Sequence, residues 1–468
     1  MSRPPVVVVG LDCPTGLQTA RIFAARDIEV LGVATNLSHP CVRTRRCRRV
    51  VEAAPGPEGV VTALLSLAEE LEGPAVLIPC TDVAVLGIAR HRSRLSDHYL
   101  MALPAPEVVE ALMDKARFAQ LAEQHRLPIP ATRIVRTRAD MVAVAAETSF
   151  PCVFKPSLKS VAWDGHVPAK AFIVDTPTGL LELYDRHHVW ADAFVVQEWI
   201  EGGDTDHYTC DCYLARDGEA LVTFCTRKLR QWPPIVGQAC LSVENRNDHV
   251  LEGALKTLRA AGHHGQGYVE MKWDARTGRH VVIEANIGRP TGRSAAAEKA
   301  GVELLMTVYS DLAGLALPED RTQRFRGYKW IHIRRDLQAC AFLLLEGGIT
   351  IREILSSWRG TFAFALFSLR DPVPFLADFT AAIRSVLPTL PPGRRAAMRP
   401  RTVRPKQPLE LAPLEVPEPT NGNGSTGGDG GRVEVPAMPG AKRRIPRDSL
   451  ITLTCAGIGL LPMILLRG

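Results

Sequence analysis

The alternation of patterns at the start of the chain constrains its fold more than any other feature. Residues Val6–Val9 form a short apolar run, typical of a strand buried on both faces, and a turn that contains Gly10 and Gly16 follows. An amphipathic helical pattern comes next, and a second strand begins near Glu29. A β-α-β unit of this kind joins parallel strands, so the sequence predicts a parallel sheet.

The same alternation extends the predicted sheet along the chain. We expect a helix around residues 59–71, a strand at residues 75–79 and a helix after Asp82. Residues 1–104 are therefore predicted to form a Rossmann-like α/β domain.

A dinucleotide-dependent oxidoreductase is the alternative enzyme that such a domain suggests. The spacing of Gly10 and Gly16 is G-x-x-x-x-x-G, which is not the G-x-G-x-x-G fingerprint of dinucleotide sites. Thr35 and Asn36 offer no acidic partner for a ribose after the second strand. The bland interpretation is that these glycines close the turn and let the helix pack.

The rest of the chain divides by composition. Residues 105–390 mix strand and helix patterns of α+β character, and form the second, larger domain. Residues 391–448 are predicted to be a disordered linker, because eleven prolines and eight glycines leave too little apolar surface to offset the cost of ordering. That linker also carries eleven Lys and Arg against five acids up to residue 447, which accounts for the formal net charge of +6. The rest of the chain is neutral overall, so we expect no nucleic-acid partner.

The final segment, residues 449–468, is a short hydrophobic tail. The apolar run Ile451–Leu466 reaches roughly 24 Å as a helix, against the ~30 Å core of a bilayer. Three alternatives stay open, a membrane contact, a docking peptide and an unstructured remnant, and the last two together are favoured over the membrane contact. No signal peptide precedes Val6, so we expect a cytoplasmic protein whose eleven cysteines are free thiols.

Cys210 and Cys212 are the one cysteine pair with a spacing of interest. They lie at i and i+2 of an expected strand, so their thiols share a face. No second ligand pair follows, and packed strand thiols are favoured over a zinc site.

Several charged residues call for a common explanation. Lys155 lies in an expected strand between apolar neighbours, and Lys115 lies in an expected helix with Met113 and Asp114. A strand lysine is costly to bury without a partner, so a phosphate is one interpretation and a snorkelling surface lysine the other.

A strand that ends in Gly-Gly suits nucleotide recognition. Its last residues are Gln197, Glu198, Trp199 and Ile200, whose backbone groups are placed to read an adenine. Asp204 and Asp206 follow, with carboxylates suited to ribose hydroxyls, although a strand followed by a polar turn is ordinary. Arg227 and Lys228 are expected just after another strand, where they suit phosphoryl oxygens or a substrate carboxylate, with a solvated charge pair as the alternative.

The strongest pattern is a predicted hairpin with acids at equivalent ends of its strands. A tight turn around Gly278 brings Glu270 and Glu284 together, and Asn286 shares the face of Glu284. Clustered carboxylates repel unless a cation joins them, and hard divalent cations take oxygen ligands, so Mg²⁺ is the expected metal. Arg289 and Arg293 add positive charge suited to an anion.

In this order and spacing, these elements resemble the ATP-grasp ligases, especially the carboxylate–amine ligase group, over roughly residues 1–385. The resemblance implies a Rossmann-like domain followed by two α+β subdomains that hold ATP between them. It implies that Lys115 and Lys155 bind the nucleotide, that Gln197–Ile200 contact the adenine, and that the metal ligands are Glu270, Glu284 and Asn286. Mg²⁺ is the expected ion, with Mn²⁺ as the alternative.

The chain departs from the family pattern at two places. Gly288 stands where many relatives of E-x-N-x-R pattern have arginine, so either Arg289 or Arg293 takes that role. The phosphate-covering loop, residues 157–170, contains a single glycine, with Lys159 and Ser160 as candidate phosphate contacts.

The implied reaction is the ATP-dependent activation of a carboxylate for capture by an amine. Arg289, Arg293 and Arg227 would act on the charge that develops, Lys228 would bind the nucleotide, and no side-chain nucleophile is needed. The non-enzyme alternative is an ATP-binding sensor or scaffold recruited through its tail. A homodimer is usual for the family, and the identity of the two small-molecule substrates has no readable signal in the sequence.

Overall fold

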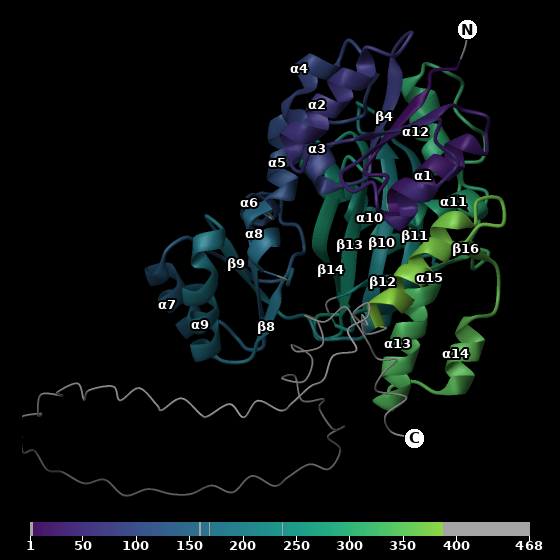
Figure 1. Cartoon of the computed structure of the whole chain (residues 1–468). Helices are drawn as coiled ribbons and strands as arrows, with labels where there is room; N and C mark the ends of the chain where they lie inside the picture. The colour runs from purple at the N-terminus through teal and green to yellow at the C-terminus, as the bar shows by residue number, and fades with distance from the viewer. Residues whose placement is uncertain (1–2, 159–160, 168, 236, 387–468) are drawn as a thin grey trace, which may run out of the picture.

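The computed structural model describes residues 3–158, 161–167, 169–235 and 237–386. Lys159 and Ser160, the linker and the tail lie outside the described residues. Within them, the strands form sheets of five, four and seven strands. Figure 1 shows the five-stranded sheet at the top, the seven-stranded sheet in the centre and the four-stranded sheet in a lobe to one side.

The five-stranded sheet confirms the Rossmann-like prediction. It has the order β3-β2-β1-β4-β5, and all its neighbouring strands are parallel. The strands are β1 (Val6–Val9), β2 (Val30–Ala34), β3 (Arg49–Glu52), β4 (Ala75–Pro79) and β5 (Tyr99–Leu100). The helices are α1 (Pro14–Ala24), η1 (Pro40–Arg43), α2 (Pro57–Ala68), α3 (Asp82–Arg90) and α4 (Arg92–Leu95). Every residue of β1, β2 and β4 is buried, as their apolar runs predict.

The turn after β1 packs closely against the loop between β4 and α3. Gly10 has a φ of +90°, and a Cβ at this position would lie 2.7 Å from a side-chain carbon of Thr81, the residue that caps α3. A Cβ on Gly16 would lie 2.2 Å from the Gly10 carbonyl oxygen. Both glycines therefore serve close packing, as the bland interpretation of the turn expected.

Two helices connect the first sheet to the lobe, α5 (Pro106–Met113) and α6 (Lys115–Gln124). The prediction of one helix carrying Met113, Asp114 and Lys115 is wrong at this point. Asp114 has an extended backbone and caps α6, because its carboxylate accepts the backbone N–H groups of the first turn. Lys115 is thus the first residue of a helix.

The lobe is a four-stranded antiparallel sheet with helices on it. Its order is β6-β9-β7-β8. The elements are β6 (Thr132–Val135), α7 (Arg138–Glu147), β7 (Cys152–Pro156), α8 (Val161–His166), β8 (Phe172–Val174), α9 (Pro177–His187), η2 (His188–Trp190) and β9 (Phe194–Glu198). Phe154 stacks on Phe194 with 4.8 Å between ring centroids, and Trp163 completes this core.

The seven-stranded sheet forms the body of the molecule. Its order is β14-β13-β10-β11-β12-β15-β16, and only β15 and β16 pair in parallel among its described strands. The strands are β10 (His207–Leu214), β11 (Ala220–Trp232), β12 (Gln238–Glu244), β13 (Gly265–Asp274), β14 (Arg279–Ile287), β15 (Lys329–Ile331) and β16 (Phe362–Phe364). Its shorter helices are η3 (Asp204–Asp206), α11 (Ser294–Lys299), α12 (Leu304–Leu312) and α14 (Ile351–Ser357). Three longer ones are α10 (Asp248–Ala260), α13 (Ile333–Leu345) and α15 (Val373–Val386).

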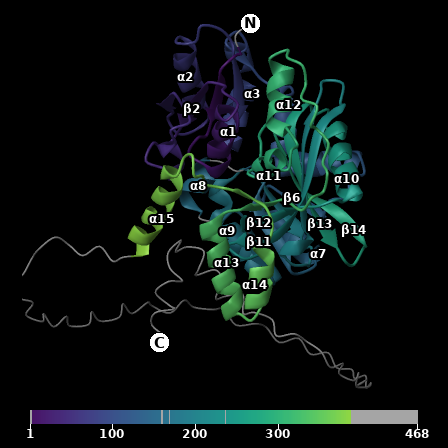
Figure 2. The same cartoon turned by 90° about the vertical axis from the view of Figure 1, so that its right-hand side faces the viewer.

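The end of the described chain returns to the first sheet. In Figure 2, α15 runs beside the five-stranded domain and away from the seven-stranded sheet. Asp371, just before α15, accepts a hydrogen bond from Arg21 Nε at 2.9 Å and another from the Thr44 hydroxyl at 2.6 Å. The two ends of the described chain are therefore joined by buried polar contacts.

Several cysteine, tryptophan and arginine side chains have structural roles. Cys210 and Cys212 are buried in the core between β10, β13 and α10, as packed strand thiols. Trp330 is a core residue, and the Trp358 indole N–H donates to Asp336 at 2.7 Å. Arg334 is held by Asp378 through two bonds of 2.7 and 2.9 Å. None of the helices in the described part of the chain is long and apolar enough to cross a membrane.

Candidate active site

Two carboxylates face each other across the β13–β14 hairpin. Glu270 and Glu284 are register partners, so the predicted pairing is confirmed. The turn between the strands forms because the Asp274 carboxylate accepts the Arg276 backbone N–H at 3.0 Å and Gly278 takes a φ of +65°. Opposed residues of an antiparallel pair share a face, so both carboxylates lie on the same face of the large sheet.

Asn286 lies two residues beyond Glu284 on that face. Its Nδ2 donates to Glu284 Oε2 at 3.5 Å, and its Oδ1 accepts from Arg289 Nη2 at 2.7 Å. The oxygen donors here are two carboxylates and one amide. The described residues contain no group of three or more His, Cys, Asp or Glu side chains arranged to hold a metal. This donor set fits Mg²⁺, which takes one or two protein carboxylates together with water and substrate phosphates.

Arg289 connects this face to the five-stranded domain. Its Nε lies 2.5 Å from Asp82 Oδ1, and its Nη1 donates to the Tyr268 hydroxyl at 2.6 Å. Only 15% of the Arg289 side chain is exposed. The guanidinium is thus fixed between α3 and the large sheet.

Gly288 explains why the arginine is displaced by one position. Its φ is +70°, and a Cβ there would lie 2.3 Å from a side-chain carbon of Leu103 and 2.9 Å from one of Val85. Both the backbone conformation and the contact with the first domain therefore exclude a side chain at residue 288.

Arg293 lies on the other side of Glu270. Its Nη2 is 3.4 Å from Glu270 Oε1 and 3.2 Å from the Thr209 hydroxyl oxygen. Tyr268 lies between the two arginines, with guanidinium carbons 5.1 Å (Arg289) and 5.6 Å (Arg293) from its ring centroid. Both candidate arginines therefore border the carboxylate pair.

The charge balance at Glu270 favours its ionised form. Burial alone would raise the pKa of Glu270, but the cations Lys228 and Arg293 outweigh it and hold the pKa below the ordinary value. Lys170 contributes in the same direction, so a lysine of the lobe acts on a carboxylate of the body. Burial lowers the pKa of Lys228, whose charge is shared between Glu270 and Asp204.

The two predicted nucleotide lysines approach the site from the connecting helix and the lobe. Lys115 Nζ lies 4.0 Å from Glu284 Oε1. Lys155, in β7, donates from Nζ to Gln197 Oε1 at 3.0 Å. Burial and the nearby Lys115 lower the pKa of Lys155 to about 8, while Glu284 opposes that shift. Both lysines are therefore within electrostatic reach of Glu284.

The segment Gln197–Ile200, predicted to contact the adenine and called the hinge below, is anchored on both sides. Glu198 accepts from Arg276 Nη2 at 2.6 Å, so its carboxylate is already engaged. Lys272, a buried lysine of β13, donates to the carbonyls of Ile200 at 2.7 Å and Gly202 at 3.2 Å. Its Nζ also lies 4.8 Å from the centroid of the Trp199 ring. These contacts fix the backbone between the lobe and the body.

The remaining predicted residues take different positions. Asp204 accepts the Gln231 backbone N–H at 3.0 Å, and Asp206 accepts that of Gly203 at 2.8 Å. Arg227 donates to the Thr205 carbonyl and lies over the Tyr208 ring, so it turns away from the carboxylate pair. The prediction that Arg227 and Lys228 follow a strand is wrong, because both lie inside β11, where consecutive side chains point to opposite faces.

Five residues of this site were not among the predicted ones. They are Asp82, Lys170, Thr209, Asp211 and Lys272. Asp211 is 2% exposed, and burial raises its pKa to about 6 although the charge of Arg293 opposes this. A buried acid within an apolar strand pattern was the available signal for Asp211.

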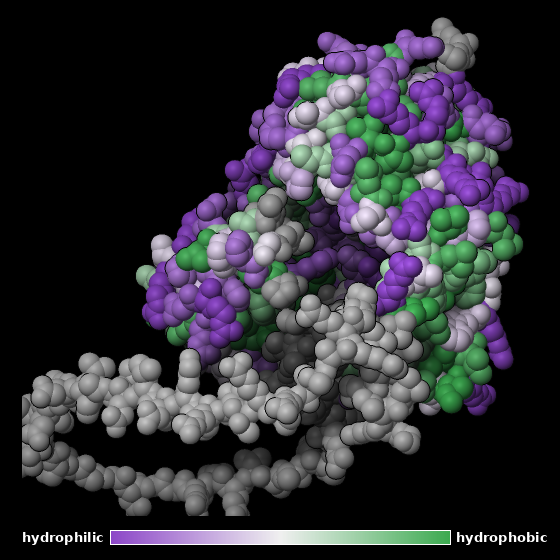
Figure 3. Space-filling model, in the orientation of Figure 1, coloured by the Kyte–Doolittle hydropathy of each residue, from purple (hydrophilic) through white to green (hydrophobic). Residues whose placement is uncertain are grey.

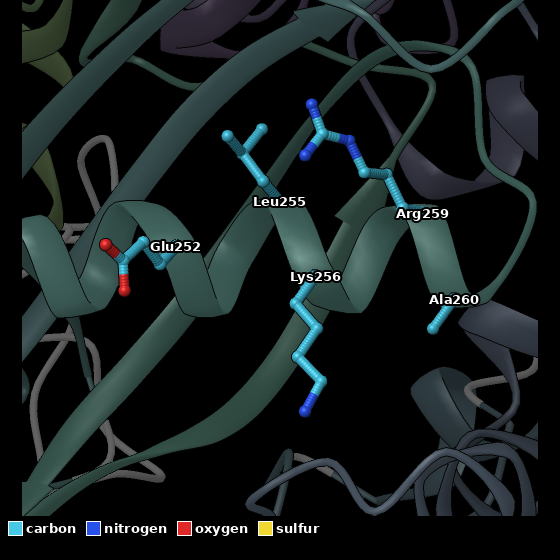
Figure 4. Close-up of a pocket in the computed structure, with 5 residues that line it drawn as sticks. All are labelled: Glu252, Leu255, Lys256, Arg259 and Ala260. Atoms are coloured by element: carbon cyan, nitrogen blue, oxygen red, sulfur yellow. The ribbon is translucent and has the colours of Figure 1, made fainter.

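The surface of the molecule is hollowed between the lobe and the body. Figure 3 shows a recess with a hydrophilic floor between the lobe and the body. A cavity of about 600 Å³ lies behind the hinge and is lined by Pro128–Pro130, Glu198, Ile200, Asp274, Arg276, Thr277, Arg279 and Val281. A second cavity, of about 570 Å³, lies on α10 and is lined by Glu252, Leu255, Lys256, Arg259 and Ala260 (Figure 4). Neither cavity is lined by the carboxylate pair Glu270 and Glu284 or by Lys115, Lys155 and Lys228.

Comparison with known proteins adds a sequence relationship. The chain is 25% identical over 263 residues to a D-aspartate ligase of Enterococcus faecium (strain Aus0004). The aligned segment covers 52% of this chain and 61% of that protein, so the chain spans less than two thirds of its relative's length. No model of a protein family matches the chain.

Solved structures share the fold. An N5-carboxyaminoimidazole ribonucleotide synthetase in complex with ADP has a TM-score of 0.54 at 14% identity, over 69% of this chain and 80% of its own. An L-amino acid ligase from Bacillus licheniformis has a TM-score of 0.52 at 15% identity, over 70% and 78%. The biotin carboxylase domain of a Hydrogenobacter thermophilus 2-oxoglutarate carboxylase, solved with MgADP, has a TM-score of 0.53 at 15% identity, over 69% and 72%. The chain therefore shares the fold of these three enzymes over about 70% of its length.

Proposed function

We propose that the protein is an ADP-forming ligase, which uses ATP to activate a carboxylate as an acyl phosphate that an amine then captures. The observation that carries this proposal is the meeting of Lys115, Lys155 and Lys228 around the opposed pair Glu270 and Glu284. Cations and paired carboxylates at one recess suit a metal–nucleotide complex, in which each neutralises part of the other's charge.

Each group has a part in this reaction. Glu270, Glu284 and Asn286 would hold Mg²⁺, or Mn²⁺ in its place, and the bound ion would neutralise phosphate charge. Lys115 and Lys155 would bind the phosphates, and the backbone of Gln197–Ile200 would bind the adenine. Asp204 or Asp206 would bind the ribose after release of its backbone partner.

Arg289 and Arg293 are placed to stabilise the charge that develops on the transferred group, because both border the carboxylate pair. Lys228 is placed to act on the same charge, because it lies close enough to Glu270 to lower the pKa of that carboxyl group. Arg227 faces Thr205 and Tyr208, which supports a role in holding η3 rather than in the transfer itself.

The chemistry balances without a protein nucleophile. A substrate carboxylate oxygen attacks the γ-phosphorus, the bond from that phosphorus to the β–γ bridging oxygen breaks, and ADP leaves. The amine then forms a bond to the acyl carbon, inorganic phosphate leaves with the shared electron pair, and the amine nitrogen loses a proton. The protein's contribution is orientation and a fixed field of charge.

D-aspartate is the first acid to test, because the related ligase carries that name. A second small-molecule amine would be the acceptor. We further propose that residues 1–104 and residues 105–390 act as separate domains around the substrates, that the protein works in the cytoplasm, and that it forms a homodimer.

The test is phosphate release by the full-length chain with ATP and Mg²⁺, screened with D-aspartate, other amino acids and pooled amines. Release that depends on both an acid and an amine, and that Glu284→Ala abolishes, would support the ligase. Glu252→Ala is the matched control, since Glu252 is exposed on α10, away from the recess. If the chain binds ATP but no pool raises its turnover, the ligase proposal fails and the sensor alternative gains.

A further inference from the structure

Arg293 is only weakly held where it stands. Among the described residues its single carboxylate contact is the 3.4 Å approach of Nη2 to Glu270 Oε1, and the Thr209 hydroxyl is the other partner of that nitrogen. Its Nε is buried and has no hydrogen-bond partner among the described residues. A guanidinium that leaves a buried N–H unpaired has unused capacity to bind an anion.

Asp211 is a buried carboxylate with an acceptor atom left over, just as Arg293 has a donor left over. It is 2% exposed, and its Oδ2 finds no hydrogen-bond partner within the described part of the chain. The Thr291 hydroxyl bonds to the Asp211 carboxylate, and the same hydroxyl oxygen accepts the Arg293 backbone N–H at 2.9 Å. Asp211 is therefore tied to the segment that carries Arg293, although its second oxygen remains unused.

The strand register places these groups on one face. Thr209 is the register partner of Glu270, and Asp211 is the register partner of Tyr268, two residues further along each strand. Side chains at i and i+2 of a strand share a face, so Glu270 and Asp211 both lie on the side where Arg293 sits. The charge of Arg293 acts on both carboxyl groups.

A divalent cation at Glu270 would change this balance, and here the inference rests on the proposed function. The cation would take the carboxylate lone pairs that Arg293 now approaches, and would repel the guanidinium. Arg293 would then need another carboxylate, because a buried unpaired charge is costly.

We propose that Asp211 is a positioning residue that receives Arg293 when a divalent cation occupies Glu270. In this arrangement Arg293 pairs with Glu270 in the free site and with Asp211 in the loaded site. Asp211 therefore keeps the guanidinium close to the transferred group without letting it compete for the metal ligand.

The experiment measures Mn²⁺ binding to the full-length chain with ADP by electron paramagnetic resonance. Asp211→Asn keeps the shape but removes the charge, so Arg293 stays on Glu270 and Mn²⁺ binding weakens about tenfold. Asp192→Asn, at an exposed position of the lobe, is the matched control and leaves binding unchanged. Thermal unfolding of each variant separates loss of folding from loss of metal.

The same substitution made in the Arg293→Ala protein tests whether Asp211 acts through Arg293. In Arg293→Ala the guanidinium that competes for Glu270 is absent, so adding Asp211→Asn has less than a twofold further effect on Mn²⁺ affinity. An equal loss in both backgrounds would mean that Asp211 acts on the metal or on folding directly, and would overturn the proposal. So would Mn²⁺ affinity in Asp211→Asn equal to that of the control.

The same measurement separates this inference from the proposed function. If the unaltered chain binds Mn²⁺ with ADP and Asp211→Asn changes nothing, only the role of Asp211 is lost. If the unaltered chain binds no Mn²⁺ with ADP, the proposed metal site fails, and the role of Asp211 fails with it.

Discussion

Arg289 and Asp82 are 207 residues apart in the chain, and their side chains meet at 2.5 Å between Nε and Oδ1. Asp82 is the first residue of α3 in the five-stranded domain, whereas Arg289 directly follows the positive-φ glycine after β14. Because Arg289 also donates to Asn286, a residue of the first domain sets the position of a candidate metal ligand in the second.

Replacing Asp82 with asparagine should weaken that connection. We expect a loss of about 1 kcal/mol in the free energy of unfolding, since the Asp82 side chain is half-exposed and solvent screens the pair. Urea unfolding measures it, with exposed Asp97→Asn as the control.

The effect of Asp82 should also depend on pH. Burial alone would raise the pKa of Asp82, but the charge and the hydrogen bond of Arg289, together with the charges of Lys115 and Lys170, outweigh it and lower the pKa. A carboxyl group with a lowered folded-state pKa stabilises fully above its unfolded value of about 3.9, and this contribution is lost as the pH falls through the folded value. The difference between the two proteins should therefore vanish in acid, and a constant difference down to that range would contradict the ion pair.

Lys155 should make nucleotide binding sensitive to alkaline pH. Its pKa in the free protein is lowered to about 8 by burial and by Lys115. Phosphates prefer the charged lysine, so ATP affinity should be constant below pH 8 and fall about tenfold per pH unit above it, until the pKa of the bound form is reached. Calorimetric titrations across pH 7–10 measure this.

Lys155→Arg is the informative comparison, because arginine stays charged over this range. Its ATP affinity should lack the step near pH 8. A step of equal size in both proteins would assign the titration to another group.

Lys272 should stabilise the folded protein through the two hydrogen bonds that it donates. Replacing it with methionine leaves the carbonyls of Ile200 and Gly202 without their buried donor, and we expect a loss of about 2–3 kcal/mol in the free energy of unfolding. Denaturant unfolding provides the value. Lys256→Met, on the exposed side of α10, should change it far less.

The buried pair of Arg230 and Asp336 supplies a further prediction. Two bonds of 2.8 and 2.9 Å join them, with side chains that are 4% and 0% exposed, and Trp358 donates to the same carboxylate. Asp336→Asn removes one charge and strands the other, so a loss of about 3–5 kcal/mol is expected by chemical denaturation. The corresponding change at Asp185, whose pair with Arg138 is exposed, should have a much smaller effect.

The sequence patterns that predicted the fold correctly were local. The apolar run Val6–Val9 and the acids of the β13–β14 hairpin carry their periodicity within a few residues, so the parallel sheet and the pairing of Glu270 with Glu284 could be predicted. The strand position of Lys155 followed from its apolar neighbours.

The missed residues depend on contacts between distant segments. Asp82 lies at an ordinary helix start, and only the packing of the two domains brings it to Arg289. The contact of the Glu198 side chain with Arg276 likewise depends on the hairpin turn, which has no signal near residue 198 in the sequence. Lys228 was expected after a strand because a charged stretch is typical of loops, whereas the long β11 passes through it with shifts in register.

The close packing around Gly288 limits which segments can be exchanged between this protein and others of the same fold. Leu103 and Val85 occupy the volume that an arginine at residue 288 would require, so restoring the family spacing by Gly288→Arg would push the two domains apart. A chimera that carries an E-x-N-x-R segment from a ligase of this fold would therefore also need that ligase's residues at positions 85 and 103. The active-site spacing of this protein is, in that sense, inherited together with its domain interface.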